Sequence, residues 1–427
     1  MSVLVLGAGA SGSSAGRLAH ADGRTVAYFD DDGDAEKRSV SDDVRFVGPP
    51  WESSFLDGVD LVIASPGFPP TASPIHDAER ASVPVVSEAA FGLSHTTTPY
   101  VAVTGTNGKT TVTDAVASML TASGVDAIAA GNIGLPISDV VTQEHDILVL
   151  ELSSFQLHFG EVHPVAAGLV NIAADHLDWH GSAEAYARSK ARIFESMAGG
   201  ELLAYNVDDD AVVSVVSGAR CLTVPCSGAS VPDGGNGVDG DHLVIDGVTM
   251  ETSATDVSFR LDLVIAATVA LAAGATIEGV RDVVRSFTAG EHRRQHVASV
   301  NGVAWINDSK ATNPHAAVAA SLAYDSVRLL VGGRNKDLDL TPLGDIRTVR
   351  FLYAFGESGP QIAQIASMPA AVFSTMRDAM DAAARDAVAG DTVLLSPGCA
   401  SFDEFTSYAE RGEVFQRFVR GMEGALR

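Results

Sequence analysis

The stretch that decides the fold reads Tyr100-Val101-Ala102-Val103 followed by Thr104-Gly105-Thr106-Asn107-Gly108-Lys109-Thr110-Thr111. Its first four residues form an apolar run that predicts a buried strand, and the residues after it predict a glycine-rich turn that enters a helix. Backbone amides in such a turn bind phosphate oxygens, while Lys109 supplies positive charge and Thr110 a hydroxyl for Mg²⁺. The loop is two residues shorter than the usual P-loop but keeps all these parts, so it predicts a nucleotide-phosphate site in an α/β domain.

A second glycine loop lies at the start of the chain. The predicted strand Ser2–Leu6 enters Gly7-Ala8-Gly9-Ala10-Ser11-Gly12, which has the spacing of a dinucleotide-binding loop. Asp30 follows 18 residues after Gly12, at the end of a second predicted strand, Thr25–Phe29, where a ribose would be recognised. Taken alone, this loop fits a nicotinamide site, a UDP-sugar site or a tight turn without a ligand.

The 427 residues are enough for about three domains. The strand-to-loop pattern pauses at a linker-like segment, Thr96–Pro99, and restarts near Gly290, so we predict α/β domains at 1–97, 98–289 and 290–427. Within the second domain we expect an exposed hairpin or loop region around Ser227–Gly240 and a helix from an N-cap at Asp262 to Gly274.

Composition narrows the classes of function. The chain has 54 acidic and 28 basic residues, a formal net charge of −26, which disfavours nucleic acids and anionic lipid surfaces as partners. Three cysteines do not indicate a disulfide framework, and the longest uncharged stretch, Leu263–Ile277, is shorter than the roughly 20 residues that span a bilayer. We therefore expect a cytoplasmic protein that binds small anions. Its few lysines deserve particular interest: Lys37, Lys109, Lys190, Lys310 and Lys336.

Polar residues follow two further predicted strands. Glu151 ends the run Ile147–Leu150, and a carboxylate at a strand end near a P-loop is a natural Mg²⁺ ligand. His176 follows the strand Ala167–Val170, where ligand sites of α/β proteins lie. The residue pattern fits His176 equally well as a metal ligand or as a helix-capping histidine.

Taken together, several segments resemble the Mur ligase family, and within it the enzymes that add D-glutamate. The segments are Thr104–Thr110, Gly131–Gly134, Leu150–Leu157, Asp175–Asp178, Tyr186–Arg192, Asn307–Asn313 and Leu395–Ser401. Their joint specificity is far higher than that of either glycine loop. The sequence lacks the Asp-Asn-Pro-Arg signature of the lysine- or diaminopimelate-adding relatives, which favours D-glutamate.

The resemblance implies a fold and a reaction. A Rossmann-like N-terminal domain would hold the UDP part of the substrate rather than NAD, followed by a central P-loop ATPase-like domain with a parallel or mixed sheet and a C-terminal Rossmann-like domain. ATP would phosphorylate the carboxylate of UDP-N-acetylmuramoyl-L-alanine, and D-glutamate would attack the acyl phosphate, in cytoplasmic peptidoglycan synthesis. We also expect two Mg²⁺ ions and a monomer.

The resemblance also implies residue roles in the first two domains. The UDP-substrate contacts would be Ala10, Ser11, Asp30, Gly67, Asn132 and His176, and the ATP phosphates would lie on Gly105, Thr106, Asn107, Gly108, Lys109, Thr110 and Thr111. The metal ligands would be Thr110, Glu151, His176 and Lys190, and the catalytic residues Lys109, Glu151, His176 and Lys190. Lys190 matches a family lysine that is carbamylated, a change that turns a cation into an anionic oxygen ligand.

In the third domain, the resemblance assigns Arg293 and Asp308 to ATP. The D-glutamate contacts would be Thr312, Lys336, Ser401 and Tyr408. A lysine with hydroxyl groups suits a dicarboxylate.

Departures from the family pattern keep alternatives open. Ser258, Phe259 and Asp262 stand where the family has a His-Asn…Asn pattern near adenine, so the resemblance does not say how adenine is held. The competing functions are a Mur-type ligase for another amino acid, a relative that binds ATP without turnover, and an NAD-dependent oxidoreductase. The oxidoreductase would leave Lys109 and Lys190 without a role.

Overall fold

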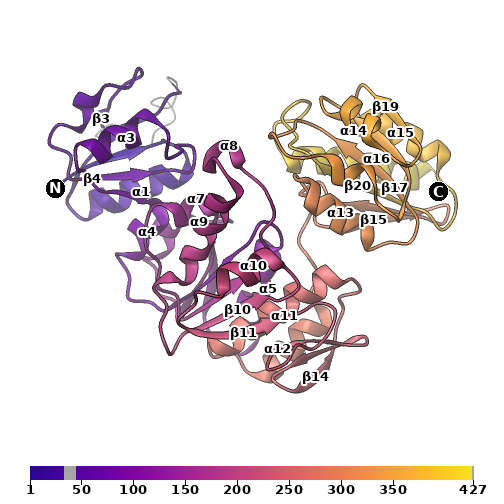
Figure 1. Ribbon diagram of the computed structural model, residues 1–427, viewed down its shortest axis with the longest axis horizontal. Coiled ribbons are helices and arrows are strands. Elements are labelled where there is room, and N and C mark those ends of the chain that lie inside the picture. The colour runs from indigo at the N-terminus through magenta and orange to yellow at the C-terminus, as the bar shows by residue number, and fades with distance from the viewer. Residues whose placement is uncertain (33–44, 426–427) are drawn as a thin grey trace. The chain divides into compact units, whose positions relative to one another are not determined.

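A computed structural model describes residues 1–32 and 45–425, with the backbone alone at 423–425. The chain divides into two compact units (Figure 1). Unit 1 comprises Met1–Ile172 and Trp179–Phe287, and unit 2 comprises Ala173–Asp178 and Thr288–Arg427. The short segment Ala173–Asp178 therefore leaves unit 1 and packs with unit 2.

Unit 1 begins with a five-stranded parallel sheet in the order β3-β2-β1-β4-β5. Its strands are β1 (Ser2–Leu6), β2 (Thr25–Phe29), β3 (Arg45–Phe46), β4 (Leu61–Ala64) and β5 (Val85–Ser87), with the helices α1 (Ala10–Ala21), α3 (Ser73–Arg80) and α4 (Glu88–Leu93) and the 3₁₀ turn η1 (Ser53–Leu56). Alternate residues of β1 enter different cores: Val3 and Val5 one, Leu4 and Leu6 the other. This strand is thus covered on both faces, as its continuous apolar run predicts.

The second sheet of unit 1 has six parallel strands in the order β11-β10-β9-β6-β8-β7. They are β6 (Tyr100–Thr104), β7 (Ala127–Gly131), β8 (Ile147–Glu151), β9 (Ala166–Leu169), β10 (Leu202–Asn206) and β11 (Leu222–Cys226). The strand that precedes the P-loop, β6, lies between β8 and β9, with Val103 opposite Glu151 and Thr104 opposite Leu169. The P-loop and Glu151 therefore lie together at the carboxyl ends of the central strands.

Helices surround this sheet, and a small antiparallel sheet adjoins it. The helices are α5 (Lys109–Ala122), α6 (Ile137–Val140), α7 (Ser154–His158), α8 (Leu177–His180), α9 (Ala183–Glu195), α10 (Asp210–Val216), α11 (Val257–Ala272) and α12 (Ile277–Ser286). The antiparallel sheet is β12 (Gly237–Asp239), β13 (His242–Ile245) and β14 (Val248–Glu251).

One local prediction in this region is wrong, and a second is confirmed only in part. Helix α11 begins earlier than expected: Asp256 is its N-cap, accepting a hydrogen bond from the N–H of Phe259, and Asp262 lies buried inside the helix. The segment Ser227–Gly240 ends in a hairpin, because β12 pairs antiparallel with β13, but it is only partly exposed, since the Asn236 side chain is buried and hydrogen-bonded to Thr268. The polar residues at both places were noticed in the sequence, but where α11 begins and which side chains are buried depend on tertiary packing.

Unit 2 holds a six-stranded sheet in the order β15-β16-β20-β17-β18-β19, parallel except for β15. Its strands are β15 (Gln295–Val300), β16 (Val303–Asn307), β17 (Val327–Gly332), β18 (Val349–Phe355), β19 (Ala370–Phe373) and β20 (Thr392–Gly398). The helices are α13 (Pro314–Leu322), α14 (Gly359–Ile365), α15 (Met376–Asp386) and α16 (Tyr408–Ala425), with the 3₁₀ turn η2 (Thr341–Gly344). The predicted α/β fold class is confirmed.

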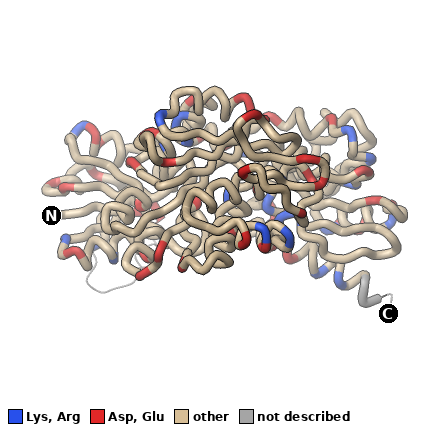
Figure 2. The backbone as a smooth tube through the Cα atoms, turned by 90° about the horizontal axis from the view of Figure 1, so that it is seen from below, with Lys and Arg blue, Asp and Glu red and all other residues tan. Residues whose placement is uncertain are grey.

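The negative charge is distributed along the chain. Figure 2 shows acidic positions recurring through the tube rather than gathering in one segment. Among the residues that the structure describes, every helix is too short or too polar to span a bilayer.

Candidate active site

The turn between β6 and α5 has the geometry of an anion site. Gly108 is the N-cap of α5 with φ +80°, a left-handed conformation that favours glycine, and no side chain caps the helix there. A Cβ at Gly108 would also lie 2.5 Å from Oδ1 of the buried Asp262. The uncapped amides at the start of this 14-residue helix are suited to phosphate oxygens.

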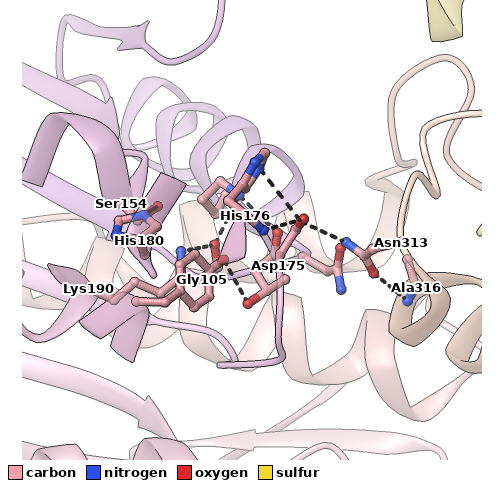
Figure 3. Close-up of polar contacts among 12 residues, drawn as sticks. Gly105, Ser154, Asp175, His176, His180, Lys190, Asn313 and Ala316 are labelled. Carbon is pink, nitrogen blue, oxygen red and sulfur yellow. Dashed lines mark hydrogen bonds and ion pairs between the residues drawn. The ribbon is translucent and has the colours of Figure 1, made fainter. Parts of the chain in front are cut away.

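Two lysines point to the same carbonyl of this turn. The Nζ of Lys109 donates to the carbonyl oxygens of Gly105 and Thr106, each at 3.0 Å. The Nζ of Lys190, which reaches from α9 and is 1% exposed, donates to the Gly105 oxygen at 2.7 Å (Figure 3). It also lies 4.5 Å from the centre of the Tyr186 ring. The two cations are thus concentrated beside the phosphate turn.

Glu151 connects the turn with the neighbouring strand end. Its Oε2 accepts a hydrogen bond from the Thr110 hydroxyl at 2.6 Å, and its Oε1 accepts one from Nδ2 of Asn132 at 2.7 Å. Glu151 is 2% exposed, so a carboxylate is buried among neutral donors. A hydroxyl and a carboxylate in contact are the oxygen ligands that Mg²⁺ prefers, and the site therefore fits this ion.

The described residues hold no group of three or more His, Cys, Asp or Glu side chains close enough to bind a metal ion. A site formed by Thr110 and Glu151 therefore depends on oxygen ligands from other groups.

The first glycine loop is organised around Asp30. Its Oδ2 accepts a hydrogen bond from the N–H of Ala8 at 2.8 Å, which places the carboxylate against the loop before α1. A Cβ at Gly12 would lie 1.9 Å from the Gly7 carbonyl oxygen, so Gly12 is required for the turn, whereas Gly9 and Gly67 have open space at that position. Ala10 and Ser11 open α1, which no side chain caps. The predicted UDP residues of this region thus lie at the carboxyl ends of β1, β2 and β4.

In unit 2, Asp308 is held at the end of β16. Its carboxylate accepts hydrogen bonds from the N–H of Arg294 at 3.0 Å and from the hydroxyl of Ser396 at 2.7 Å. Burial raises the pKa of Asp308 to about 6, although these bonds and nearby arginines favour the charged form. An acidic group kept at this energetic cost is a candidate for function.

The residues predicted for D-glutamate lie on loops at adjacent strand ends. Thr312 follows β16, Lys336 follows β17 and Ser401 follows β20, and these three strands are neighbours in the sheet. Arg334 and Ala400 exchange two backbone hydrogen bonds of 2.9 Å, which joins the second loop to the third. The structure therefore brings these three predicted residues to the carboxyl ends of three neighbouring strands in unit 2.

Arg411 connects the loop after β16 with the end of β20 through hydrogen bonds. Its guanidinium donates to Oγ and to the carbonyl oxygen of Ser309, at 3.0 and 2.9 Å, and to the carbonyl oxygen of Cys399 at 3.1 Å. Burial lowers the pKa of Arg411 to about 10, so the side chain remains charged at neutral pH. The helix that carries Arg411 also begins with Tyr408, whose carbonyl accepts from the Ser309 hydroxyl and whose ring lies 4.0 Å from the Nζ of Lys310.

His176 lies in Ala173–Asp178, a short segment of unit 2 that is flanked in the chain by residues of unit 1. The neighbouring Asp175 accepts a hydrogen bond from Nδ2 of Asn313 at 3.3 Å, and its other oxygen accepts one from the N–H of His176 (Figure 3). His176 thus lies in unit 2, while the other predicted metal ligands, Thr110, Glu151 and Lys190, lie in unit 1.

Left-handed backbone recurs beside the predicted site residues. His176, His292, Arg294 and Asp337 have φ values of 52°, 62°, 46° and 58°. Such conformations are costly for residues other than glycine and are common at functional sites. His292 and Arg294 adjoin Arg293 in the chain, Asp337 follows Lys336, and the N–H of Arg294 donates to Asp308.

Comparison with known proteins fits this geometry. The Mur ligase MurD-like N-terminal domain matches residues 1–87, the Mur ligase middle domain 103–231, and the Mur ligase glutamate ligase domain 292–399. The chain belongs to the Mur ligase family. The three matches follow the order of the N-terminal, central and C-terminal sheets.

Named relatives align with the Mur ligase chain over nearly its full length. It is 39% identical to a UDP-N-acetylmuramoylalanine–D-glutamate ligase of Frankia casuarinae, over 99% of this chain and 94% of the relative. It is 35% identical to the enzyme of that name in Streptomyces coelicolor, over 98% and 97%. The UDP-N-acetylmuramate–alanine ligase of Thermotoga maritima shares the fold, with a TM-score of 0.61 at 15% identity over 99% of both chains.

Some residues that organise the Mur ligase site were not predicted as site residues. Asn171 accepts hydrogen bonds from the N–H groups of Thr106 and Asn107 through its Oδ1, at 3.0 and 2.8 Å. The Tyr186 hydroxyl lies 3.1 Å from the Thr106 hydroxyl. The position of Asn171 directly after a strand, and of Tyr186 four residues before Lys190 on a helix, are signals that point to both.

Proposed function

We propose that the protein ligates D-glutamate to UDP-N-acetylmuramoyl-L-alanine at the expense of ATP, through an acyl phosphate. The observation that carries this proposal is the cluster at the β6–α5 turn, where Lys109, Lys190 and the Thr110–Glu151 pair surround one phosphate-binding turn. The full-length relatives that bear the name of this ligase support the choice of substrates.

In the first step, an oxygen of the substrate carboxylate attacks the γ-phosphorus of ATP and ADP leaves. The amine of D-glutamate then attacks the acyl carbon, a tetrahedral intermediate forms, and phosphate leaves as the amine loses its proton. Lys109 and the amides of α5 stabilise the negative charge of the transferring phosphoryl group. Such chemistry depends on positioning and charge stabilisation rather than on a protein nucleophile.

Thr110 and Glu151 would hold one Mg²⁺, and His176 with a carbamylated Lys190 would complete a two-ion arrangement. When bound, Mg²⁺ neutralises the phosphate charges. The buried position of Lys190 beside the phosphate turn supports this role. Asn132, which already contacts Glu151, would guide the substrate toward this centre.

Ala10, Ser11, Asp30 and Gly67 would bind the UDP part of the substrate in the N-terminal sheet. The open space at Gly9 and Gly67 and the uncapped start of α1 suit a diphosphate. In unit 2, Arg293 would contact the phosphates of ATP and Asp308 its ribose. The D-glutamate carboxylates would bind Lys336 and the side chains of Thr312, Ser401 and Tyr408.

We extend the proposal to the organisation of the protein. The domain boundaries would fall near Thr97 and Gly290, giving 1–97, 98–289 and 290–427. The protein would act as a cytoplasmic monomer on small-molecule substrates. Size-exclusion chromatography with light scattering tests the monomer, for which a mass near 44.2 kDa is expected.

Substrate omission tests the proposed reaction. Phosphate release from ATP is measured with both substrates, with each alone, and with D-glutamate replaced by L-lysine or diaminopimelate. We expect release only when UDP-N-acetylmuramoyl-L-alanine and D-glutamate are both present. Release with L-lysine but not D-glutamate would identify a different Mur-type ligase, and tight ATP binding without release would identify a non-catalytic relative.

A further inference from the structure

Trp179 connects α8 with the loop that follows β4. Its Nε1 donates a hydrogen bond of 3.1 Å to the carbonyl oxygen of Pro66, 113 residues earlier in the chain. Pro66 directly precedes Gly67, and the Oγ of Ser65 lies 3.0 Å from the position of a Cβ on Gly12. The hydrogen bond therefore attaches α8 to the two adjacent loops that the proposed function gives to the UDP group.

Aromatic rings fix the orientation of this indole. The Trp179 ring lies 4.8 Å from Phe155, 5.2 Å from His158 and 6.0 Å from Phe159, between ring centres. The ring of the adjacent His180 lies at 4.4 Å. Since several neighbours surround the ring, the N–H is directed at Pro66 by packing and not by the hydrogen bond alone.

The helix behind the indole is itself firmly placed. Helix α7 begins with a capping box, in which Ser153 and Gln156 exchange hydrogen bonds, three residues after Glu151. Its end is bound to the N-terminal sheet, because the carbonyl oxygen of Phe159 accepts from the N–H of Ser87. The indole thus packs on α7, the helix that follows Glu151, the proposed Mg²⁺ ligand, in the chain.

The hydrogen bond between the indole and the loop is partly buried. The space beside Trp179, Pro66 and Phe155 is also lined by Ser11 and Ser65. Loss of the donor would leave a partly buried carbonyl oxygen without this hydrogen bond, which costs free energy. Side chains of both UDP loops share this lining.

We propose that Trp179 is a positioning residue for the UDP-bearing substrate. It fixes the Ser65–Gly67 loop relative to α7 and hence to the end of β8, so that the site for the nucleotide is held at a set distance from Glu151. All these residues lie in unit 1. This inference rests on the proposed function, and it concerns the binding and placement of the UDP substrate rather than the affinity for ATP or D-glutamate.

The test substitutes Trp179→Phe, which keeps an aromatic ring and removes the N–H. We expect KM for UDP-N-acetylmuramoyl-L-alanine to rise about tenfold and the affinity for UDP alone, measured by calorimetry, to fall similarly. The KM values for ATP and D-glutamate should stay within about twofold of the wild-type values. A second variant, Trp179→His, retains a ring N–H and should recover part of the loss.

Trp51→Phe is the matched control. The Trp51 Nε1 donates to Oδ2 of Asp77 at 2.8 Å, and its ring packs against Phe29 and Phe55 in the same N-terminal region. The same atom is therefore removed from a comparable bond, and all three KM values should remain unchanged.

The outcomes separate the two proposals. Wild-type turnover with D-glutamate decides the proposed function before any variant is made, and its absence overturns both proposals. If the wild type is active, an unchanged KM for the UDP substrate in Trp179→Phe overturns the positioning role. An equal rise in all three KM values overturns it as well, because general destabilisation would produce that pattern.

Discussion

The phosphate turn of unit 1 and the predicted D-glutamate loops of unit 2 are built in contrasting ways. At the phosphate turn the predicted residues bind each other or the same atom: Thr110 contacts Glu151, and Lys109 and Lys190 share the Gly105 carbonyl. In unit 2 the loops are joined by residues outside the predicted set, chiefly Arg411. The predicted groups of the first region contact each other, with Asn171 and Tyr186 adding further hydrogen bonds to the turn, whereas the loops of the second region are joined mainly by residues outside the predicted set.

The largest effect is expected from breaking the phosphate turn at Lys190. Lys190→Ala removes the buried group that we propose as a carbamate, and kcat should fall about 10³-fold, in the range seen when one charge-stabilising group is lost. Phosphate release with both substrates measures this. Bicarbonate with a short carboxylic acid should restore part of the activity, because the acid can supply the missing oxygen ligands.

Lys190→Arg is the control for charge. Arginine keeps the positive charge and does not form the carbamate, so this variant should be as inactive as Lys190→Ala. Substantial activity in Lys190→Arg, or full activity in Lys190→Ala, would contradict the carbamate role.

Lys336→Met sharpens the comparison on the unit 2 side. Removing one charge-assisted contact to a carboxylate should raise KM for D-glutamate by about 10- to 100-fold and leave KM for ATP nearly unchanged. Arg334→Met is the matched control, because Arg334 is an exposed cation on the same loop that pairs with Glu357 at 3.0 Å. If both variants raise KM for D-glutamate equally, the general charge of the loop rather than Lys336 binds the substrate.

Asp308→Asn separates function from stability in unit 2. Burial raises the pKa of Asp308 from 3.8 to about 6, so the folded state binds this proton more tightly than the unfolded state. The free energy of unfolding therefore decreases as the pH rises from about 4 to about 6 and stays lowered above that. At pH 7 the variant should be more stable by on the order of 2 kcal/mol, with little difference at pH 4.

The same variant should bind ATP less well, with KM about tenfold higher, because the ribose loses a charged acceptor. In the wild type, KM for ATP should rise as the pH falls below 6. Denaturant titrations at the two pH values and ATP kinetics check these expectations. A variant that is less stable at both pH values would show that Asp308 is structural.

The smallest effect concerns the charge that both units share. With a net charge of −26, self-repulsion opposes the folded state, and salt screens it. Raising KCl from 0.05 to 1 M should increase Tm by a few degrees. A Tm that is constant or falls with KCl would show that the acidic residues are too well separated to destabilise the fold.

The helices and strands and most of the contacts at the β6–α5 turn could be predicted from the sequence, because both depend on local patterns. The apolar run before Gly105 predicts β6, and the carboxylate after Ile147–Leu150 predicts the contact of Glu151 with the P-loop. The burial of Arg411 could not be predicted, because it depends on where α16 packs, and neither could the start of α11 at Asp256. Long-range packing leaves no local signal in either case.

The pairing of Trp179 with Pro66 shows the same limit. A tryptophan after a Mur-type histidine segment carries no sign that its N–H reaches the β4 loop. Its role follows from two segments that only the fold brings together.

Phosphate release with and without each substrate tests the central claim most directly. The account predicts release from ATP that requires both UDP-N-acetylmuramoyl-L-alanine and D-glutamate and that disappears in Lys109→Ala. Release that is independent of D-glutamate, or that persists in Lys109→Ala, would contradict it.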